Sequence, residues 1–440
     1  MSELVDKKSV FTYIEKNEKE LVEFLRQLIC IDSISPGEGA ALETEAQAFF
    51  SKYLEDMGLD VKCVALDEKK IRPNVFGTYK GSGGGKNIIF NSHIDTVPIN
   101  DPELWTCPPF GGELRDGRIY GRGAADDKMG LACMVFALKS LMANNIRPRG
   151  DVTILSTVGE ESGEGGTVGA GALLAAEKPD AQFAIVSEFS GMDIDIQSVS
   201  LVFFDLVVKG KANHVMTRNQ AVFPQAHNIG SGHEVGVDAL EKALPFIEML
   251  YRKERDWNLN FRGEILGSGG SPYHDCMGVG IFVINPCHIE VKSYMASLLS
   301  EIKITYCVYF NNAYSIEDIK NEISRDVAAL ASTDSWLREN PPEVHCPVLY
   351  QWQGLKTDVN DPGIAVLKQA AKDALGREPT VTGLKTVCDA SYFEQAGIPC
   401  VVLGPGTPDN RLHGTDEYMD ISDIIEATKV YASMMIDYCC

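Results

Sequence analysis

Hydrophobic positions in the first 196 residues follow two alternating periods. Apolar residues recur three and four apart over residues 9–30 and again over 43–57, which predicts two amphipathic helices. Short β-branched or wholly apolar runs follow, with further helical stretches between them. The predicted strands cover residues 61–64, 74–79, 86–90, 152–158 and 183–186, and the further helices cover residues 129–144 and 168–177. Because strands alternate with helices, this part of the chain predicts an α/β fold around a mostly parallel central sheet.

The pattern changes near residue 197 and changes back near residue 354. Between these points, long strands and long helices are spaced as in a small α+β domain with an antiparallel sheet. The strands are predicted at 198–209, 278–285 and 301–309, and the helices at 235–255 and 316–330. The α/β pattern then returns in a helix, a strand and a closing helix, at 361–375, 400–403 and 421–438. We therefore predict two domains, with residues 197–354 inserted into a catalytic domain formed by 1–196 and 355–440.

Composition and charge narrow the possible partners and compartments. The 440 residues carry a formal net charge of −22. An acidic surface repels nucleic acid and anionic membranes, so we expect neither as a partner. The twelve cysteines are scattered without a CxxC pair, the first residues lack an apolar signal segment, and no apolar run is long enough for a bilayer. These features predict a cytoplasmic protein with free thiols.

Polar side chains that could bind metal ions fall at predicted strand ends or loop mouths. Alone, a motif such as His93-x-Asp95 after a strand is more often a polar loop pair than a metal site. Solvated loops do not explain, however, why five candidates follow successive strands. The candidates are His93, Asp126, Glu161, Glu188 and His413. Two histidines and three carboxylates suit two Zn²⁺ ions per subunit, with Co²⁺ or Mn²⁺ as alternatives, and a carboxylate can bridge the two. Glu160, beside Glu161, is then the expected general base.

The same residues, in the same order, carry a resemblance to a known family. The motifs are His93-x-Asp95, residues 121–128, Glu160-Glu161, Glu188 and His413. They resemble the ordered motifs of the di-zinc deacylase and peptidase family of acetylornithine deacetylase, succinyl-diaminopimelate desuccinylase, aminoacylase and a glutamate-releasing carboxypeptidase. The resemblance covers most of the chain. It implies a zinc-peptidase-like catalytic domain with an inserted ferredoxin-like α+β domain, which serves as lid and dimerisation domain, and hence a homodimer.

The resemblance also implies how the metal ligands divide between two sites. Asp126 is the implied bridging carboxylate, and its neighbour Asp127 is the competing assignment. The other ligands are His93 and Glu188 at one site, and Glu161 and His413 at the other. In the family, a Glu at the position of Glu188 is found mostly in deacylases and carboxypeptidases, whereas dipeptidases tend to have Asp. This residue therefore favours deacylation.

Three further residues are implied to act in the reaction. Glu160 is the implied general base, and Asp95 is implied to orient His93. His214, in the inserted domain, matches a family histidine that reaches a neighbouring subunit's active site and helps polarise the scissile carbonyl. The alternative for His214 is an ordinary surface histidine.

Two departures from the family pattern lie in the inserted domain. After His214 the family has small residues and a proline, whereas residues 215–220 read Val-Met-Thr-Arg-Asn-Gln. In the strand that contains residues 305–310, family members often place an arginine for the substrate carboxylate, and this chain has none. This puts in doubt an N-acyl amino acid held in the usual way. The candidate substitutes are Arg218, Arg262 and Arg411.

Other polar residues have simpler interpretations. Asp389 precedes a helix and is expected to cap it. Residues 404–406, Gly-Pro-Gly, are either a tight turn or a source of backbone N–H donors for substrate. The remaining histidines are expected to be surface or satisfied polar residues; they are His227, His233, His274, His288 and His345.

Together, these features predict a metal-dependent amidohydrolase that acts on a small N-acyl amino acid or a related compound, as deacylases do. A metallo-carboxypeptidase or dipeptidase with the same site is the nearest alternative. A catalytically silent binding protein is a more distant one.

Overall fold

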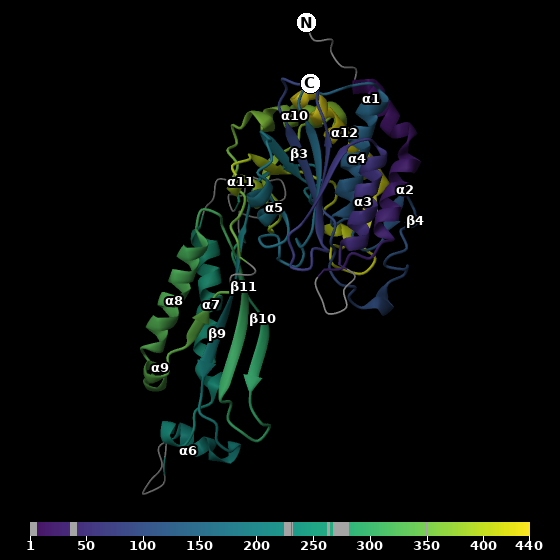
Figure 1. The fold of residues 1–440 in the computed structure, drawn as a ribbon. Helices are drawn as coiled ribbons and strands as arrows, with labels where there is room; N and C mark the ends of the chain where they lie inside the picture. Colours follow the sequence, from purple (N-terminus) through teal and green to yellow (C-terminus); the bar gives the residue numbers. More distant parts are fainter. Residues whose placement is uncertain are drawn as a thin grey trace. The chain divides into compact units, whose positions relative to one another are not determined.

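The computed structural model describes residues 7–35, 42–223, 230, 232–261, 265–266, 281–347 and 351–440. The chain divides into two compact units (Figure 1). Unit 1 comprises Met1–Ser198, Leu355–Leu384 and Cys388–Cys440, and unit 2 comprises Val199–Gly354 and Lys385–Val387. The start of the predicted strand 278–285 lies outside the described residues, as do Arg262, His227 and His274. That unit 2 acts as a lid and dimerisation domain stays a prediction.

An eight-stranded sheet forms the centre of unit 1. Its strand order is β1-β2-β6-β3-β7-β15-β8-β14, and the four strands β6, β3, β7 and β15 run parallel. The bounds are β1 (Asp60–Ala65), β2 (Pro73–Tyr79), β6 (Val152–Thr157), β3 (Ile88–His93), β7 (Phe183–Val186), β15 (Cys400–Val402), β8 (Ile194–Ser198) and β14 (Val381–Leu384). The predicted α/β class with a mostly parallel sheet is therefore confirmed.

Helices cover both faces of this sheet, which is why its strands are apolar on both sides (Figure 1). One face carries α1 (Lys7–Lys16), α2 (Glu18–Ile29), α3 (Thr44–Asp56), α4 (Lys128–Ala143), α10 (Pro362–Leu375) and α12 (Ile421–Cys439), and the other carries α5 (Ala170–Glu177) and α11 (Ala390–Gln395). Successive residues of β3 serve opposite faces. Phe90 packs edge-on against Tyr431 of α12 at 5.5 Å between ring centroids, while Ile89 joins the apolar cluster beneath α5 and α11. An aromatic pair of this kind contributes about 0.5–1.5 kcal/mol beyond its buried area.

A small three-stranded sheet joins two distant segments of unit 1. It has the order β16-β5-β4, with β16 (Tyr418–Asp420), β5 (Arg118–Tyr120) and β4 (Glu113–Arg115). Tyr418 is paired with Tyr120 in the antiparallel register of β16 and β5. The residues that follow β5 are therefore held beside those that precede β16.

Three predicted elements differ from the observed ones. The strand predicted to end at residue 285 is β10, which runs from Val283 to Lys292. The predicted helix 9–30 is two helices, because the chain breaks at Asn17, whose side-chain amide donates to the Tyr13 carbonyl at 2.7 Å. The predicted strand 198–209 is β9 (Ser200–Lys209), which starts two residues later than predicted, because Ser198 is the last residue of β8 in a different sheet. β8 was missed because Asp193 and Asp195 resemble loop residues, although both are buried.

Unit 2 is an antiparallel sheet with two long helices packed on it. The strand order is β10-β11-β9-β12, and β13 also pairs with β9. The elements are β9, β10 (Val283–Lys292), β11 (Glu301–Phe310), β12 (Glu343–His345), β13 (Gln351–Trp352), α6 (Arg218–Val222), α7 (Ala239–Asn260), α8 (Ile316–Ala331) and α9 (Ser335–Glu339). Alternate residues of β11, such as Ile304 and Val308, are buried in one apolar cluster with Phe246 of α7 and Ile323 of α8. This period of two is the signature of a sheet with one covered face.

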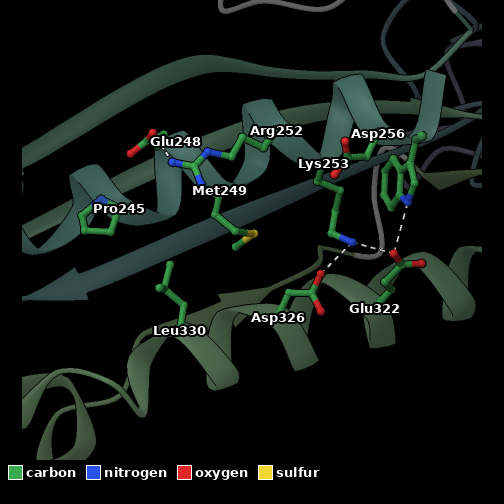
Figure 2. A pocket seen from close by; sticks show the side chains of 10 residues that line it. Pro245, Glu248, Met249, Arg252, Lys253, Asp256, Glu322, Asp326 and Leu330 are labelled. Carbon is green, nitrogen blue, oxygen red and sulfur yellow. Dashed lines mark hydrogen bonds and ion pairs between the residues drawn. The ribbon is translucent and has the colours of Figure 1, made fainter. Parts of the chain in front are cut away.

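Charged side chains link the two long helices of unit 2 across a groove (Figure 2). Lys253 of α7 lies 2.5 Å from Glu322 and 2.6 Å from Asp326, both on α8. Glu322 also accepts a hydrogen bond from the Trp257 indole N–H at 3.1 Å. Because Lys253 already binds both carboxylates, these contacts are best explained as helix pairing.

Candidate metal centre and active site

The strand ends of unit 1 bring the predicted metal ligands together. His93 is the last residue of β3, Glu161 lies in the turn after β6, and Glu188 follows β7 by two residues. Because these strands are parallel, their carboxyl ends meet at one edge of the sheet, where α/β folds carry their sites. Asp126 lies just before α4, in a cis peptide bond with Asp127, and His413 lies in the loop before β16.

The first group of candidate ligands is His93, Asp126 and Glu188. His93 Nε2 lies 3.0 Å from Asp126 Oδ1 and 3.8 Å from Glu188 Oε1. One ligand atom from each residue lies within 4.8 Å of the other two, as binding of a single ion requires, and all three residues are buried.

The second group is Asp126, Glu161 and His413. His413 Nε2 lies 3.2 Å from Asp126 Oδ2 and 3.1 Å from Glu161 Oε2. Asp126 thus directs Oδ1 to the first group and Oδ2 to the second, which is the arrangement of a bridging carboxylate. Asp127 is placed differently, since its Oδ1 accepts a hydrogen bond from the Ser187 hydroxyl at 3.0 Å. The geometry favours Asp126 over Asp127, while the ligand roles stay predictions.

The electrostatics of this cluster fit a pair of cations. Burial raises the pKa of Glu188 and of Glu160 well above the usual range, and it raises the pKa of Asp95 to about 8. Burial opposes ionisation of Asp126 as well, but hydrogen bonds from His413 and His93 lower its pKa. The same contacts with Asp126 and Glu161 raise the pKa of His413 to about 10.

Several carboxyl groups in this cluster thus lack a compensating positive charge. Glu161 Oε1 is, moreover, buried without a hydrogen-bond partner. Divalent cations would supply both the missing charge and the missing partner, and the mixed nitrogen and oxygen donors suit Zn²⁺ and similar ions.

Asp95 contacts His93, as predicted, and also the turn that carries Glu160 and Glu161. His93 Nδ1 lies 3.0 Å from the Asp95 carbonyl oxygen but 3.7 Å from its carboxylate, so the backbone of Asp95 orients the ring. Its carboxylate instead accepts the backbone N–H groups of Glu160 at 3.3 Å and Glu161 at 3.0 Å. The predicted link to His93 therefore runs through the main chain, and the side chain fixes the turn that carries the candidate base.

A buried arginine that sequence reasoning missed supports the same turn. Arg72 donates two parallel hydrogen bonds of 2.8 and 2.7 Å to Glu43, and it also donates to Glu164 at 2.8 Å and to the Ser35 hydroxyl at 2.9 Å. The Glu164 backbone N–H closes the turn on the Gly159 carbonyl at 2.8 Å. Arg72 thus holds the far side of the Glu160–Glu161 turn. No local sequence signal marks this contact, because its partners lie on three separate segments.

Asp389 does not have the predicted capping role. It stands before α11, but its side chain makes no cap hydrogen bond there. Its Oδ2 accepts from the Thr157 hydroxyl at 2.7 Å, and that hydroxyl accepts from the Asn91 side-chain amide at 3.1 Å. The cap prediction was wrong because this Asp is buried and finds a tertiary partner. The resulting bridge ties α11 to the ends of β6 and β3.

His214 belongs to unit 2, where it is exposed. Its Nδ1 accepts the Met216 backbone N–H at 3.2 Å, and it caps a short 3₁₀ turn. Its contribution to catalysis stays a prediction. Among the other described histidines, His288 and His345 are exposed and contact Glu290 and Glu343, and His233 is half-buried against the Trp336 ring.

Among the described residues, two candidate substitutes for the missing arginine are engaged in ion pairs. Arg218 lies 2.8 Å from Glu241 in unit 2, and Arg411 lies 3.7 Å from Asp416 in unit 1. In the 404–406 turn, the Gly404 N–H donates to the Ser190 hydroxyl at 3.1 Å. That contact favours the structural interpretation of the turn.

This site and fold identify the class of the protein. Residues 89–437 match the model of peptidase family M20/M25/M40, so the chain belongs to this family. It is a metal-dependent hydrolase of amide bonds, which confirms the resemblance drawn from the motifs. No helix among the described residues combines the length and apolar character needed to cross a membrane.

The chain is similar to several curated relatives over almost its whole length. The chain is 29% identical over 445 residues to N-formyl-4-amino-5-aminomethyl-2-methylpyrimidine deformylase of Halalkalibacterium halodurans, covering 98% of this chain and 97% of the relative. It is 26% identical over 428 residues to succinyl-diaminopimelate desuccinylase 2 of Ruegeria sp., covering 95% and 94%. Among solved structures, the di-peptidase Dug1p from Saccharomyces cerevisiae has a TM-score of 0.74 at 14% identity, covering 99% and 98% of the two chains. This last likeness shows the fold alone.

Proposed function

We propose that this protein removes a formyl or another small acyl group from an amine, and that the preferred substrate has no carboxylate beside the amide. The observation that carries this proposal is β11, which lacks the arginine expected to grip a substrate carboxylate. The deformylase relative agrees with it, because the compound in its name is a pyrimidine without a carboxylate. A formyl amide needs little space at the acyl side, so specificity then depends on the amine.

We assign the metal ligands as the two groups described above, bridged by Asp126, with Zn²⁺ as the proposed ion and Co²⁺ or Mn²⁺ as alternatives. Cations held there would supply Lewis acidity, which would polarise the amide carbonyl and make a water more acidic. His93, Glu188, Glu161 and His413 complete the two groups. The orphaned oxygen of Glu161 supports this assignment.

Glu160 is the proposed general base and acid. Its carboxylate takes a proton from the attacking water as the new C–O bond forms. It then delivers that proton to the amine nitrogen as the C–N bond breaks, so formate and a free amine result when the acyl group is formyl. Asp95 holds the backbone of Glu160 in place for this transfer. His214 is the proposed hydrogen-bond donor to the oxyanion that develops in the active site of the neighbouring subunit.

We also propose a homodimer formed through unit 2, and a cytoplasmic location. β10 is an edge strand of the unit 2 sheet and exposes Ile289 and Val291. An apolar edge strand is a template for pairing with another chain. Every cysteine among the described residues is free of a disulfide, which favours a reducing compartment.

A substrate panel tests the proposed function. Zinc-loaded protein is assayed on N-formyl aminomethyl-pyrimidines, N-acetyl and N-succinyl amino acids, and dipeptides, with chelated protein as control. We expect chelator-sensitive release of formate with kcat/KM at least about 100-fold above that of the N-acyl amino acids, equivalent to about 2.7 kcal/mol of transition-state discrimination. Preferred cleavage of N-acyl amino acids would contradict the argument from β11. Preferred cleavage of dipeptides would favour a peptidase.

A further inference from the structure

Arg122 and Glu417 form a buried ion pair that the proposed mechanism does not use. Arg122 Nη1 lies 2.6 Å from Glu417 Oε2, and the two side chains are each 1% exposed. Arg122 follows β5 and Glu417 precedes β16, so the pair lies where the small sheet joins the two segments. A buried ion pair seldom gains stability over apolar residues of the same volume, because desolvation of both charges offsets their attraction. Its presence beside the candidate ligands therefore calls for another explanation.

The Glu417 side of the pair holds the segment that carries the bridging carboxylate. Its second oxygen, Oε1, accepts the backbone N–H groups of Ala125 at 2.9 Å and Asp126 at 3.1 Å. A single carboxylate thus receives the guanidinium on one oxygen and two main-chain donors on the other. This fixes the main chain at the base of the Asp126 side chain.

The Arg122 side of the pair holds the histidine of the second group. Its Nη2 donates to the His413 carbonyl oxygen at 3.3 Å and to the Pro98 carbonyl at 3.3 Å. His413 has a left-handed backbone with a φ of 58°, which is unfavourable for a residue with a side chain. A contact from Arg122 to its carbonyl helps keep that conformation.

We propose that Arg122 and Glu417 are positioning residues that set the distance between Asp126 and His413, and thereby the affinity of the second group for its cation. This inference rests on the proposed assignment of the metal ligands. The first group depends on the pair only through Asp126, because His93 and Glu188 are placed by β3 and β7. The two groups should therefore respond unequally when the pair is altered.

Two conservative substitutions test the two halves of the pair. Arg122→Lys keeps the positive charge but loses the fork that reaches Glu417 and His413 together. We expect it to lower the zinc affinity of the second group by about 10–100-fold, which is the usual effect of altering a residue that orients metal ligands. The zinc affinity of the first group should stay within about twofold of its original value. Glu417→Gln removes the charge that faces Arg122 and weakens the hold on Asp126, so both ions should bind less tightly.

The measurement is competition for zinc between the full-length protein and a chromogenic chelator, which resolves two dissociation constants without an activity assay. The absorption spectrum of Co²⁺-loaded protein gives a second readout of the geometry around each ion. Phe50→Leu is the matched control, since Phe50 is fully buried in α3, a helix that packs on β1 and β2 and carries none of the candidate ligands. It should lower thermal stability and leave both zinc constants unchanged.

The outcomes separate this inference from the proposed function. If the unaltered protein binds fewer than two zinc ions, the metal assignment is wrong and the inference falls with it. If it binds two and Arg122→Lys binds both with unchanged constants, the proposed function stands and the positioning role is wrong. Equal weakening by Phe50→Leu would also overturn it, because the effect would then follow from stability alone.

Discussion

The two groups of candidate ligands share Asp126 but are built differently. His93 and Glu188 are 2% and 4% exposed at the side chain and follow β3 and β7, two paired parallel strands. In the other group, the His413 side chain is 53% exposed and comes from a loop, and Glu161 lies in a turn. One group is thus fixed by a sheet, and the other by side chains that hold two irregular segments.

This difference explains where the supporting residues occur. Register between β3 and β7 sets the main chain that leads into His93 and Glu188, because neighbouring strands keep a fixed spacing, and the His93 ring adds one contact with the Asp95 carbonyl. Loop and turn residues have no such ladder. Asp95 therefore holds the Glu161 backbone, and Arg122 holds that of His413. We infer that the first group, with His93 and Glu188, binds its cation more tightly than the second group, with Glu161 and His413.

The largest expected effect concerns a residue in neither group. Glu160→Gln should lower kcat by about 10²–10⁴-fold, because proton transfer by the base is lost, while both cations stay bound. Turnover on the best substrate and zinc content after gel filtration check this. Glu161→Gln is the matched control, with the adjacent residue changed in the same way, and it should lose a cation as well. Unchanged turnover in Glu160→Gln would refute the base assignment.

Removing one histidine from each group tests the comparison directly. His93→Ala leaves Asp126 and Glu188 buried with a partner missing, and loss of one member of a buried charged set costs about 3–5 kcal/mol. We expect it to lose zinc and to unfold at a markedly lower temperature. His413→Ala should lose one zinc ion and most activity with a much smaller change in unfolding temperature. Elemental analysis and thermal unfolding distinguish the two variants, and equal behaviour would mean that the groups are not distinct.

The sequence predicted those candidate ligands that stand next to a periodic pattern. The apolar runs before His93, Glu161 and Glu188 marked strand ends, and parallel strands bring their ends together. Asp126 could not be separated from Asp127 by residue type, since only the direction of each carboxylate decides between them. Contacts between side chains far apart in the sequence could not be predicted from local patterns. Arg122 and Glu417 are 295 positions apart, and an Asp before a helix, such as Asp389, resembles a cap until its tertiary partner is known.

The smallest effect, and the finest test of the comparison, is stepwise removal of zinc. A chelator added in increments should first remove the cation of the second group, which contains the half-exposed His413. Activity should therefore fall before thermal stability does. A ligand present at 100 times its dissociation constant stabilises the folded state by about 2.7 kcal/mol, and tighter binding stabilises it more. The first zinc ion removed is the weaker one, so its loss should shift the unfolding temperature less than loss of the second. Activity and unfolding temperature measured at each chelator concentration check this order. If activity and unfolding temperature fell together in a single transition, the comparison would be wrong. Asp126 would then couple the two groups so strongly that they act as one site.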